Sequence, residues 1–392
     1  MASTSTTLIL LTFSFLIFQC QPFTLTVKRE FSGFYYAEVH LGNPPVKANL
    51  VIDTGSGPVW VQTTQCVQCF NITYPGFDPK KSSTFRPMPS KHPLCVPIEL
   101  QPEGAYCEYD IGYAGAQYTR GYYGIDLFTF NTAVAEHQET IEVAFGLGLF
   151  NKILDFADHD HHPNIMAGVL GIGRIHPSSF LLQLSAITQM KFSYYLPRRN
   201  GDEAALHFGI DAELRHHANV QTIPILGSDN DFYYVNMTGI SVAGSVLPID
   251  PALFSYAGMG VAIDSGSLYT MFISPVYKIV KESIIAYFEE ELQLHPLVNK
   301  SRSQMDLCYD LREVKKAVRG WLSVAFHFDG GVNLQLTESL TFHAFHDLGE
   351  YCLMINEGRE VGGNILGAYQ QMNRRFFYDV GARKLSFAPE DC

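Results

Sequence analysis

The sequence has few charged residues and is short of basic ones in particular. Charged residues make up 17% of the 392 positions, and 27 Lys and Arg stand against 39 Asp and Glu, for a formal net charge of −12. Nucleic acids and anionic membrane surfaces are bound through basic patches, so this balance argues against both as partners. The 47% hydrophobic content excludes a disordered chain, because it supplies enough apolar bulk for sizeable cores.

Long apolar runs are also lacking. Leu8–Phe18 is apolar except for Thr12 and Ser14, which makes it too short to cross a bilayer but as long as a signal-peptide core. We expect residues 1–20 to be a cleaved signal, with a retained membrane anchor as the alternative. No later segment approaches about 18 consecutive apolar residues. The mature protein is therefore expected to be secreted and extracellular without a membrane anchor, with the vacuole a less favoured destination.

Helical patterns are few. Pro275–Leu294 has amphipathic spacing, and Ser178–Ile187 is a shorter candidate with Ser178 or Ser179 as its N-cap. The 32 Gly and 20 Pro, with many β-branched and aromatic residues, favour short strands joined by turns. The sequence therefore predicts an all-β protein, and its length suggests two lobes.

The eight cysteines fit an oxidising compartment. Removal of Cys20 with the signal would leave an odd number of cysteines. Asn-x-Ser/Thr sequons begin at Asn71, Asn236 and Asn299, which we predict as glycosylation candidates.

The order of segments repeats once along the chain. In each half, a strand precedes an apolar strand that ends in an acidic turn, and an apolar pair plus Gly follows about a hundred residues later. The repeat predicts two similar lobes, residues 33–215 and 216–392, related by a pseudo-twofold axis that would place Asp53 opposite Asp264. The matching segments are Tyr35–Gly42, Leu50–Ser56 and Val169–Gly171 in the first half, and Tyr233–Thr238, Val261–Ser267 and Ile365–Gly367 in the second.

These segments resemble the pepsin-like aspartic proteases, and within them the plant nepenthesin-type branch. The resemblance extends from about Phe34 to Cys392 and implies a bilobal pepsin-like fold with two barrel-like β lobes and a few short helices. It implies a secreted aspartic endopeptidase, apoplastic in a plant, without a metal ion or organic cofactor. The segments that carry it are Asp53–Ser56, Trp60, Gly112–Gly115, Gly168–Arg174, Lys191–Tyr194, Asp264–Ser267, Asn364–Gly367, Gln370–Asn373 and Tyr378–Gly381.

Asp53 and Asp264 are the candidate catalytic residues. Two carboxyls a few ångströms apart cannot both ionise readily, so they share one proton and titrate as a unit. The ionised member would act as general base on a water between them, while the protonated member hydrogen-bonds the substrate carbonyl. Peptide hydrolysis at acidic pH follows as the expected activity.

The neighbours of the two acids have predicted supporting roles. Glycine lets the backbone approach the carboxyls closely and donate N–H groups, and hydroxyl donors to a carboxylate favour its ionisation. By resemblance, Thr54 and Ser265 belong to a cross-lobe hydrogen-bond lattice. The remaining supporting residues are Gly55 and Gly266, which approach the carboxyls, and Ser56 and Ser267, which donate to them.

The resemblance identifies Tyr113 as the tyrosine of a flap hairpin that closes over the peptide, with its hydroxyl bonded to the indole of Trp60. The flap departs from the family pattern at Ala114–Ala116, where Gly, a polar residue and Gly are usual. Gly115 has no side chain to contact a substrate. We therefore hypothesise a flap with altered substrate contacts and weaker activity than in typical relatives.

The disulfide pattern is reduced relative to the branch. The resemblance implies a Cys308–Cys352 bond, with Cys95–Cys107 as a re-formed pair. A Cys66–Cys69 bond is possible but strained. Cys392 lacks its usual partner and is expected to be free, to pair between molecules, or to bond Cys20. Residues 21–32 are too short for the inhibitory prosegment that relatives carry.

The sequence thus favours a monomeric aspartic endopeptidase that binds an extended peptide or protein substrate between its lobes and is blocked by pepstatin-type inhibitors. The alternative is a catalytically weak or inactive pepsin-fold protein that binds or inhibits a partner protein. The cluster Asp158–His162 fits no tight zinc spacing and is interpreted as a solvated loop.

Overall fold

The computed structural model describes residues 23–96, 106–131, 138–153, 156, 162–227, 229–258, 260–298, 301–303, 305–317, 322–358 and 363–390. The predicted signal at residues 1–20, the sequon at Asn299, and Cys20 and Cys392 lie outside these ranges. Residues 158–161 of the histidine-rich cluster also lie outside them.

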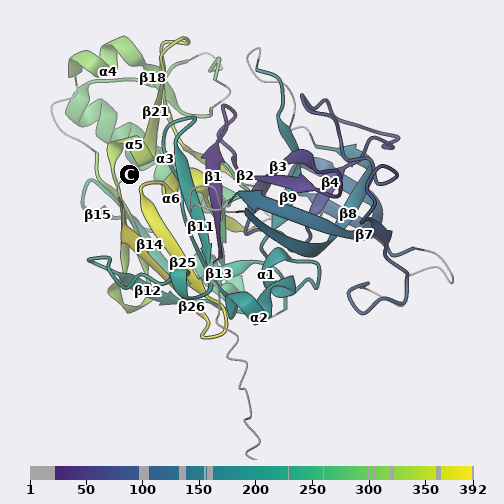
Figure 1. Cartoon of the computed structure of the whole chain (residues 1–392). Coiled ribbons are helices and arrows are strands. Elements are labelled where there is room, and N and C mark those ends of the chain that lie inside the picture. The colour runs from purple at the N-terminus through teal and green to yellow at the C-terminus, as the bar shows by residue number, and fades with distance from the viewer. Residues whose placement is uncertain are drawn as a thin grey trace, which may run out of the picture.

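The structure is built mainly from β-strands, which confirms the predicted fold class. In Figure 1 the strands β3, β4, β7, β8 and β9 lie in one lobe, β14, β15, β18 and β21 lie in another, and β1 and β11 lie between them. The strands of the first half are β1 (Phe23–Arg29), β2 (Tyr35–Leu41), β3 (Val46–Asp53), β4 (Trp60–Gln62), β5 (Arg86–Pro87), β6 (Glu108–Tyr113), β7 (Gln117–Asn131), β8 (Gln138–Lys152), β9 (Met166–Gly171), β10 (Lys191–Tyr195) and β11 (Glu203–Phe208).

The second half contributes shorter strands and the longest helix. Its strands are β12 (Gln221–Pro224), β13 (Tyr233–Val235), β14 (Met237–Val242), β15 (Ser245–Val246), β16 (Val261–Asp264), β17 (Thr270–Phe272), β18 (Cys308–Asp310), β19 (Val324–Phe328), β20 (Asn333–Leu336), β21 (Phe342–Phe345), β22 (Glu350–Leu353), β23 (Ile355–Glu357), β24 (Asn364–Gly367), β25 (Arg374–Asp379) and β26 (Lys384–Pro389). The helices of the whole chain are α1 (Phe180–Gln183), α2 (Ser185–Thr188), α3 (Ser274–Leu292), α4 (Leu311–Ala317), α5 (Glu338–Thr341) and α6 (Ala368–Gln371).

The predicted repeat is present in the strand pairing of the two halves. The order β2-β3-β9-β4-β8 in the first half matches β13-β16-β24-β17-β23 in the second. In both, the strand that ends in the acidic turn runs parallel to the strand that ends in the apolar pair plus Gly. Asp53 pairs with Gly171 and Asp264 with Gly367, so the two acids occupy equivalent positions.

Burial explains why these segments form strands. In β2 buried and half-buried side chains alternate, with Tyr35, Ala37, Val39 and Leu41 facing the core, as expected for a strand with one covered face. The last six residues of β3 are all buried. A strand covered on both faces tolerates an uninterrupted apolar run, which makes Leu50–Ile52 a rigid support for the acid that follows.

The sequence predicted residues 21–32 to be a short segment ahead of the first lobe, but part of this segment forms a strand. Phe23–Arg29 form β1, which pairs with β2 and β11. The same sheet continues through β10, β25, β26 and β12, so strands from both halves of the chain share it. Residues 23–29 are thus part of the sheet at the junction between the halves.

The long predicted helix is confirmed, with bounds Ser274–Leu292. The shorter candidate forms two brief helices, α1 and α2. Ser179 precedes α1, but its side chain makes no capping bond and donates instead to the carbonyl of Gly173 at 2.5 Å. The Ser179 hydroxyl thus bonds to the preceding loop instead of capping the helix. No helix in the described ranges is long and apolar enough to span a membrane.

Candidate active site

Asp53 and Asp264 end the central strands of the two halves and lie close together. Each is 7% exposed. A Cβ atom added to Gly55 would lie 2.6 Å from Cγ of Asp264, and one added to Gly266 would lie 2.4 Å from Oδ1 of Asp53. The turn that carries each acid therefore packs directly against the carboxyl of the other.

Hydrogen bonds hold both carboxyls in matching ways. Oδ1 of Asp53 accepts the N–H of Gly55 at 2.8 Å, and its Oδ2 accepts the hydroxyl of Ser56. Oδ1 of Asp264 accepts the N–H of Gly266 at 2.8 Å and that of Ser267 at 3.2 Å, and its Oδ2 accepts the Ser267 hydroxyl at 2.6 Å. Each carboxyl is thereby fixed by donors of its own turn.

A cross-lobe lattice lies beneath the pair. The hydroxyl of Thr54 donates to the carbonyl of Ile263 at 3.0 Å and accepts the N–H of Ser265 at 3.0 Å. The hydroxyl of Ser265 donates to the carbonyl of Ile52 at 2.8 Å and accepts the N–H of Thr54 at 3.1 Å. Thr54 is fully buried and Ser265 is 1% exposed. The two turns therefore cannot shift independently without breaking buried hydrogen bonds.

The electrostatics of the pair follow from this crowding. Burial, and next the negative charge of Asp264, raise the pKa of Asp53 from 3.8 to about 7, against the opposing effect of hydrogen bonds from Ser56 and Gly55. Two acids this close are expected to share one proton. Below about neutral pH, Asp53 thus holds a proton beside the carboxyl of Asp264.

Gly55→Ala is expected to lower kcat/KM at least about 100-fold, because misplacing a catalytic group by about 1 Å has an effect of that order. The new methyl group would lie 2.6–2.7 Å from three atoms of the Asp264 carboxyl and would push it aside. The measurement is peptide hydrolysis together with thermal unfolding. Gly239→Ala is the matched control, because its methyl group would have no neighbour closer than 4.0 Å. An unchanged rate in Gly55→Ala would contradict the geometry.

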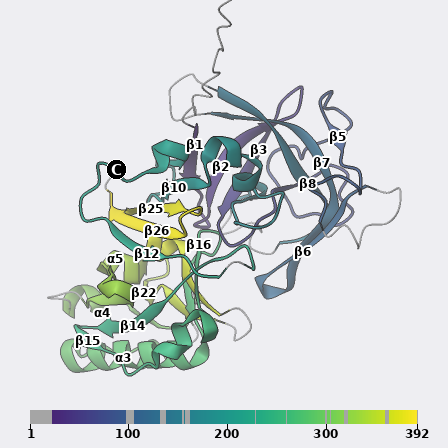
Figure 2. The same ribbon diagram turned by 90° about the horizontal axis from the view of Figure 1, so that it is seen from below.

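The hairpin of β6 and β7 carries Tyr113 toward the acids, and we call it the flap. Figure 2 shows its two strands running together from the first lobe. The indole N–H of the fully buried Trp60 donates to the hydroxyl of Tyr113 at 2.7 Å, as the sequence led us to expect. Burial, and next the charge of Asp53, raise the pKa of Tyr113 far above its ordinary value, so this hydroxyl stays protonated.

The tip of the flap is a tight turn over Ala114–Ala116. Gly115 has φ 78°, and Ala116 has φ 58°, a left-handed conformation that costs an alanine about 1–2 kcal/mol. The side-chain amide of Gln117 donates to the carbonyl of Ala114 at 3.2 Å and closes the turn. The tip therefore offers a substrate backbone groups but no polar side chain at residue 115.

Gly115→Asp is expected to raise kcat/KM about 2- to 10-fold on a preferred peptide, the value of one added hydrogen bond. Aspartate tolerates the left-handed conformation of this position, and a Cβ here would have no neighbour closer than 3.6 Å. The measurement compares steady-state kcat/KM of the wild-type protein and Gly115→Asp on the same peptide. Gly115→Ala, which adds bulk without an acceptor, should not reproduce the gain. An unchanged kcat/KM in Gly115→Asp would refute the hypothesis of a weakened flap.

Several residues behind the acids belong to the motifs that carry the resemblance, but the sequence assigned them no role. The side-chain amide of the fully buried Gln371 donates to the main-chain carbonyl of Asp264 at 3.2 Å and to that of Leu366 at 2.8 Å. Its oxygen accepts the hydroxyl of Tyr194, which also contacts the hydroxyl of Tyr378 at 2.8 Å. Their place in the motifs was the available signal, but only the fold shows that they support the second acid.

The structure contains three disulfides among the described residues: Cys66–Cys69, Cys95–Cys107 and Cys308–Cys352. These include the two pairings expected and the one left open.

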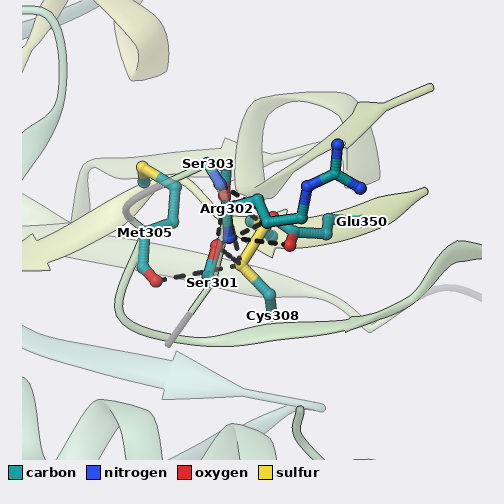
Figure 3. The surroundings of a disulfide bond; sticks show 7 residues. Ser301, Arg302, Ser303, Met305, Cys308 and Glu350 are labelled. Carbon is teal, nitrogen blue, oxygen red and sulfur yellow. Dashed lines mark hydrogen bonds between the residues drawn. A yellow bond between two sulfur atoms is a disulfide. The ribbon is translucent and has the colours of Figure 1, made fainter. Parts of the chain in front are cut away.

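The Cys308–Cys352 bond joins β18 to β22, where the two residues face each other in register. Glu350 lies beside it and is the third member of a group with potential ligand atoms. Figure 3 shows why this is not a convincing metal centre: the sulfurs are bonded to each other, and Glu350 accepts the N–H groups of Arg302 at 2.8 Å and Ser303 at 3.0 Å and the hydroxyl of Ser301 at 2.8 Å. The carboxylate anchors a loop instead.

The two described sequons differ in their surroundings. Asn71 is exposed. The amide of Asn236 is half-buried; its nitrogen donates to Asp329 at 3.0 Å and its oxygen accepts the N–H of Tyr256 at 3.1 Å. Asn71 is therefore the better placed glycosylation candidate of the two.

Comparison with known proteins agrees with this geometry. A family model described as "Xylanase inhibitor N-terminal" matches residues 35–210, and one described as "Xylanase inhibitor C-terminal" matches residues 232–389. Aspartic proteinase nepenthesin-1 from Nepenthes gracilis is 31% identical over 367 residues, covering 92% of this chain and 78% of that protein. Aspartyl protease family protein 2 from Arabidopsis thaliana is 30% identical over 373 residues, covering 92% of this chain and 71% of that protein.

The fold is also found among solved structures. The crystal structure of edgp superposes with a TM-score of 0.73 at 16% identity, covering 94% of this chain and 95% of that one. At that identity the likeness concerns the fold alone. The matches to the two family models and to the nepenthesins, joined to the paired acidic turns, show that this chain belongs to the plant nepenthesin-type branch of the pepsin-like aspartic protease family.

Proposed function

We propose that this chain is an aspartic endopeptidase that hydrolyses peptide bonds with a water held between Asp53 and Asp264. The observation that carries the proposal is the reciprocal packing of the two acidic turns, in which Gly55 lies against the carboxyl of Asp264 and Gly266 against that of Asp53. Names of relatives that include "aspartic proteinase" support the same reaction class.

In this mechanism the two acids share the proton work. The ionised carboxyl removes a proton from the water as it attacks the peptide carbon, and the protonated carboxyl donates a hydrogen bond to the carbonyl oxygen. The resulting tetrahedral intermediate breaks when a proton passes to the leaving nitrogen. Because both carboxyls have similar donors, neither Asp53 nor Asp264 needs a permanent role as base.

The flap supplies the main-chain contacts. An extended peptide beside the hairpin would hydrogen-bond to its exposed backbone, with alternate side chains directed into pockets. Tyr113, held by Trp60, would cover the reacting bond and limit access of water. We expect hydrophobic residues on both sides of the cleaved bond, an acidic pH optimum and inhibition by pepstatin-type peptides.

The proposal extends to the setting of the enzyme. We propose a secreted monomer that is released after signal cleavage, extracellular or apoplastic; the three disulfides among the described residues suit an oxidising compartment. We propose Asn71 as its main glycan site.

A second candidate is a protein of this fold that binds or inhibits a partner protein and cleaves weakly or not at all. The family models that match the chain are described as xylanase inhibitor, which favours this alternative, as does the absence of a polar side chain at the flap tip. The intact surroundings of both acids favour the enzyme.

Digestion of acid-denatured protein separates the two candidates. An endopeptidase degrades it at acidic pH and is blocked by pepstatin, whereas a binding protein leaves it intact with or without the inhibitor. Degradation that pepstatin does not reduce would contradict the proposed mechanism.

A further inference from the structure

A cavity of about 110 Å³ lies between the β1–β2 connection and the segment that follows the second acidic turn. We call it the Arg29 cavity. One wall is formed by Leu268 and Tyr269, which directly follow Ser267 in the chain. Leu268 also packs against the buried cluster that contains Trp60, and so does Tyr113. Through Leu268 the cavity wall is therefore linked to the turn that carries Asp264 and to the cluster around Trp60.

The charge of the cavity comes from Arg29. One terminal nitrogen of its guanidinium donates to the carbonyl of Arg198 and to Oδ1 of Asn200, each at 2.8 Å, while its buried Nε has no hydrogen-bond partner. Within the described part of the chain, no carboxylate pairs with Arg29 or Arg198. A buried donor on a cation without an anion beside it is unfavourable unless a ligand completes it.

The groups around the cavity respond to that charge. The positive charge of Arg29 opposes the increase that burial causes in the pKa of Tyr269, and Arg198 and Arg29 do the same at Tyr369. Burial, and next Arg29 and Arg198, lower the pKa of His343 to about 4, so this imidazole is neutral in mildly acidic solution. The nearest glutamate in sequence, Glu30, is engaged by the N–H and hydroxyl of Ser32.

We propose that the Arg29 cavity binds a carboxylate of the substrate, so that this chain prefers peptides with an acidic side chain near the cleaved bond. The inference rests on the proposed peptidase function and adds a substrate class to it. The unpaired Nε of Arg29 supplies a charged donor. Tyr269 and Tyr369 line the space that the methylene groups of an acidic side chain would fill.

The assay needs a pH at which glutamate is ionised and the acids still share a proton. Free glutamate has a pKa near 4.3, and the pKa of Asp53 is about 7. An assay at about pH 5 to 6 lies between these two values and meets both conditions. The titratable groups that line or act on the cavity are Arg29, Arg198, His343, His346, Tyr35, Tyr269 and Tyr369.

The experiment scans a cleavable peptide with blocked ends, placing Glu, Gln or Lys at each position around the cleaved bond. At one position, kcat/KM for Glu should exceed that for Gln at least about tenfold, as expected for a hydrogen bond to a charged group. Arg29→Gln should reduce this ratio to about 1, and Arg29→Glu should make Lys the preferred residue. Peptides with a free C-terminus test whether the cavity binds the terminal carboxylate of a peptide instead of an acidic side chain.

Arg86→Gln is the matched control. Arg86 is exposed, bonds Glu142, and lies in β5 on the far side of the first lobe from β1 (Figure 2). Its loss should leave the Glu-to-Gln ratio unchanged. If Arg29→Gln does not fold, as judged by thermal unfolding, Arg29→Lys and the loss of the preference in high salt test the same contact in folded protein.

Binding distinguishes failure of this inference from failure of the proposed function. Fluorescence anisotropy of labelled peptides on Asp264→Asn reports the preference without cleavage. If the wild-type protein cuts no peptide but Asp264→Asn binds the Glu peptide at least about tenfold more tightly than the Gln peptide, the function is wrong and the carboxylate site stands. Equal affinity for Glu and Gln peptides at every position, or a preference that survives Arg29→Gln, overturns the site.

Discussion

Asp264→Asn is expected to lower kcat/KM for peptide hydrolysis about 10⁴-fold, the upper range for loss of a general acid–base group. The substitution keeps the size of the side chain but removes the proton that the pair shares. Asn can still accept the N–H groups of Gly266 and Ser267, so the turn should keep its shape. Steady-state kinetics on a peptide substrate, with thermal unfolding of the same samples, gives both quantities.

Asp211→Asn provides the control for this variant, since Asp211 is an exposed acid outside the site. It should retain wild-type kinetics. If Asp264→Asn kept activity within about tenfold of wild type, the contribution of a shared proton would be smaller than general acid–base catalysis requires. The proposed peptidase mechanism would then be wrong, although the family assignment would stand.

The pH dependence of activity is the second large expected effect. The pKa of Asp53 is raised to about 7, chiefly by burial and then by the charge of Asp264. Above that pH Asp53 is ionised and can no longer donate a hydrogen bond to the substrate carbonyl. We expect kcat/KM to fall about tenfold per pH unit above pH 7, as for loss of a single proton. A profile that stayed level to about pH 9 would rule out a protonated Asp53 as the acid.

Stability should change in the same direction but over a lower pH range. A carboxyl whose pKa is raised on folding holds its proton in the folded state while the unfolded chain loses it. Its contribution is complete below pH 3.8 and is lost as the pH rises to about 7, at about 1.4 kcal/mol per pH unit. Urea unfolding of wild type and Asp53→Asn between these limits measures it, because the variant lacks this titration. Parallel pH dependence in the two proteins would contradict the raised pKa.

Much of the fold could be predicted because its signals are local and repeated. Alternating apolar residues in Tyr35–Leu41 indicate one covered face, and the β-branched run before Asp53 indicates a strand buried on both. The recurrence of the same order of segments predicted two lobes. The junction was less predictable: β1 pairs with β11 across more than 170 residues, and no local pattern in Phe23–Arg29 specifies so distant a partner.

The candidate site likewise has features that the sequence predicts and features that only the structure shows. The sequence by itself determined which residues are the candidates for the chemistry, because Asp, hydroxyl and Gly at fixed spacing define each acidic turn locally. Only the tertiary structure decided that Gly55 lies against Asp264 and that Gln371 supports the second acid. Only the folded chain, likewise, places Arg29 beside Tyr269 around a cavity. The physical reason is that burial, close approach and charge coupling depend on distances between residues far apart in sequence, and those distances exist only when both halves pack together.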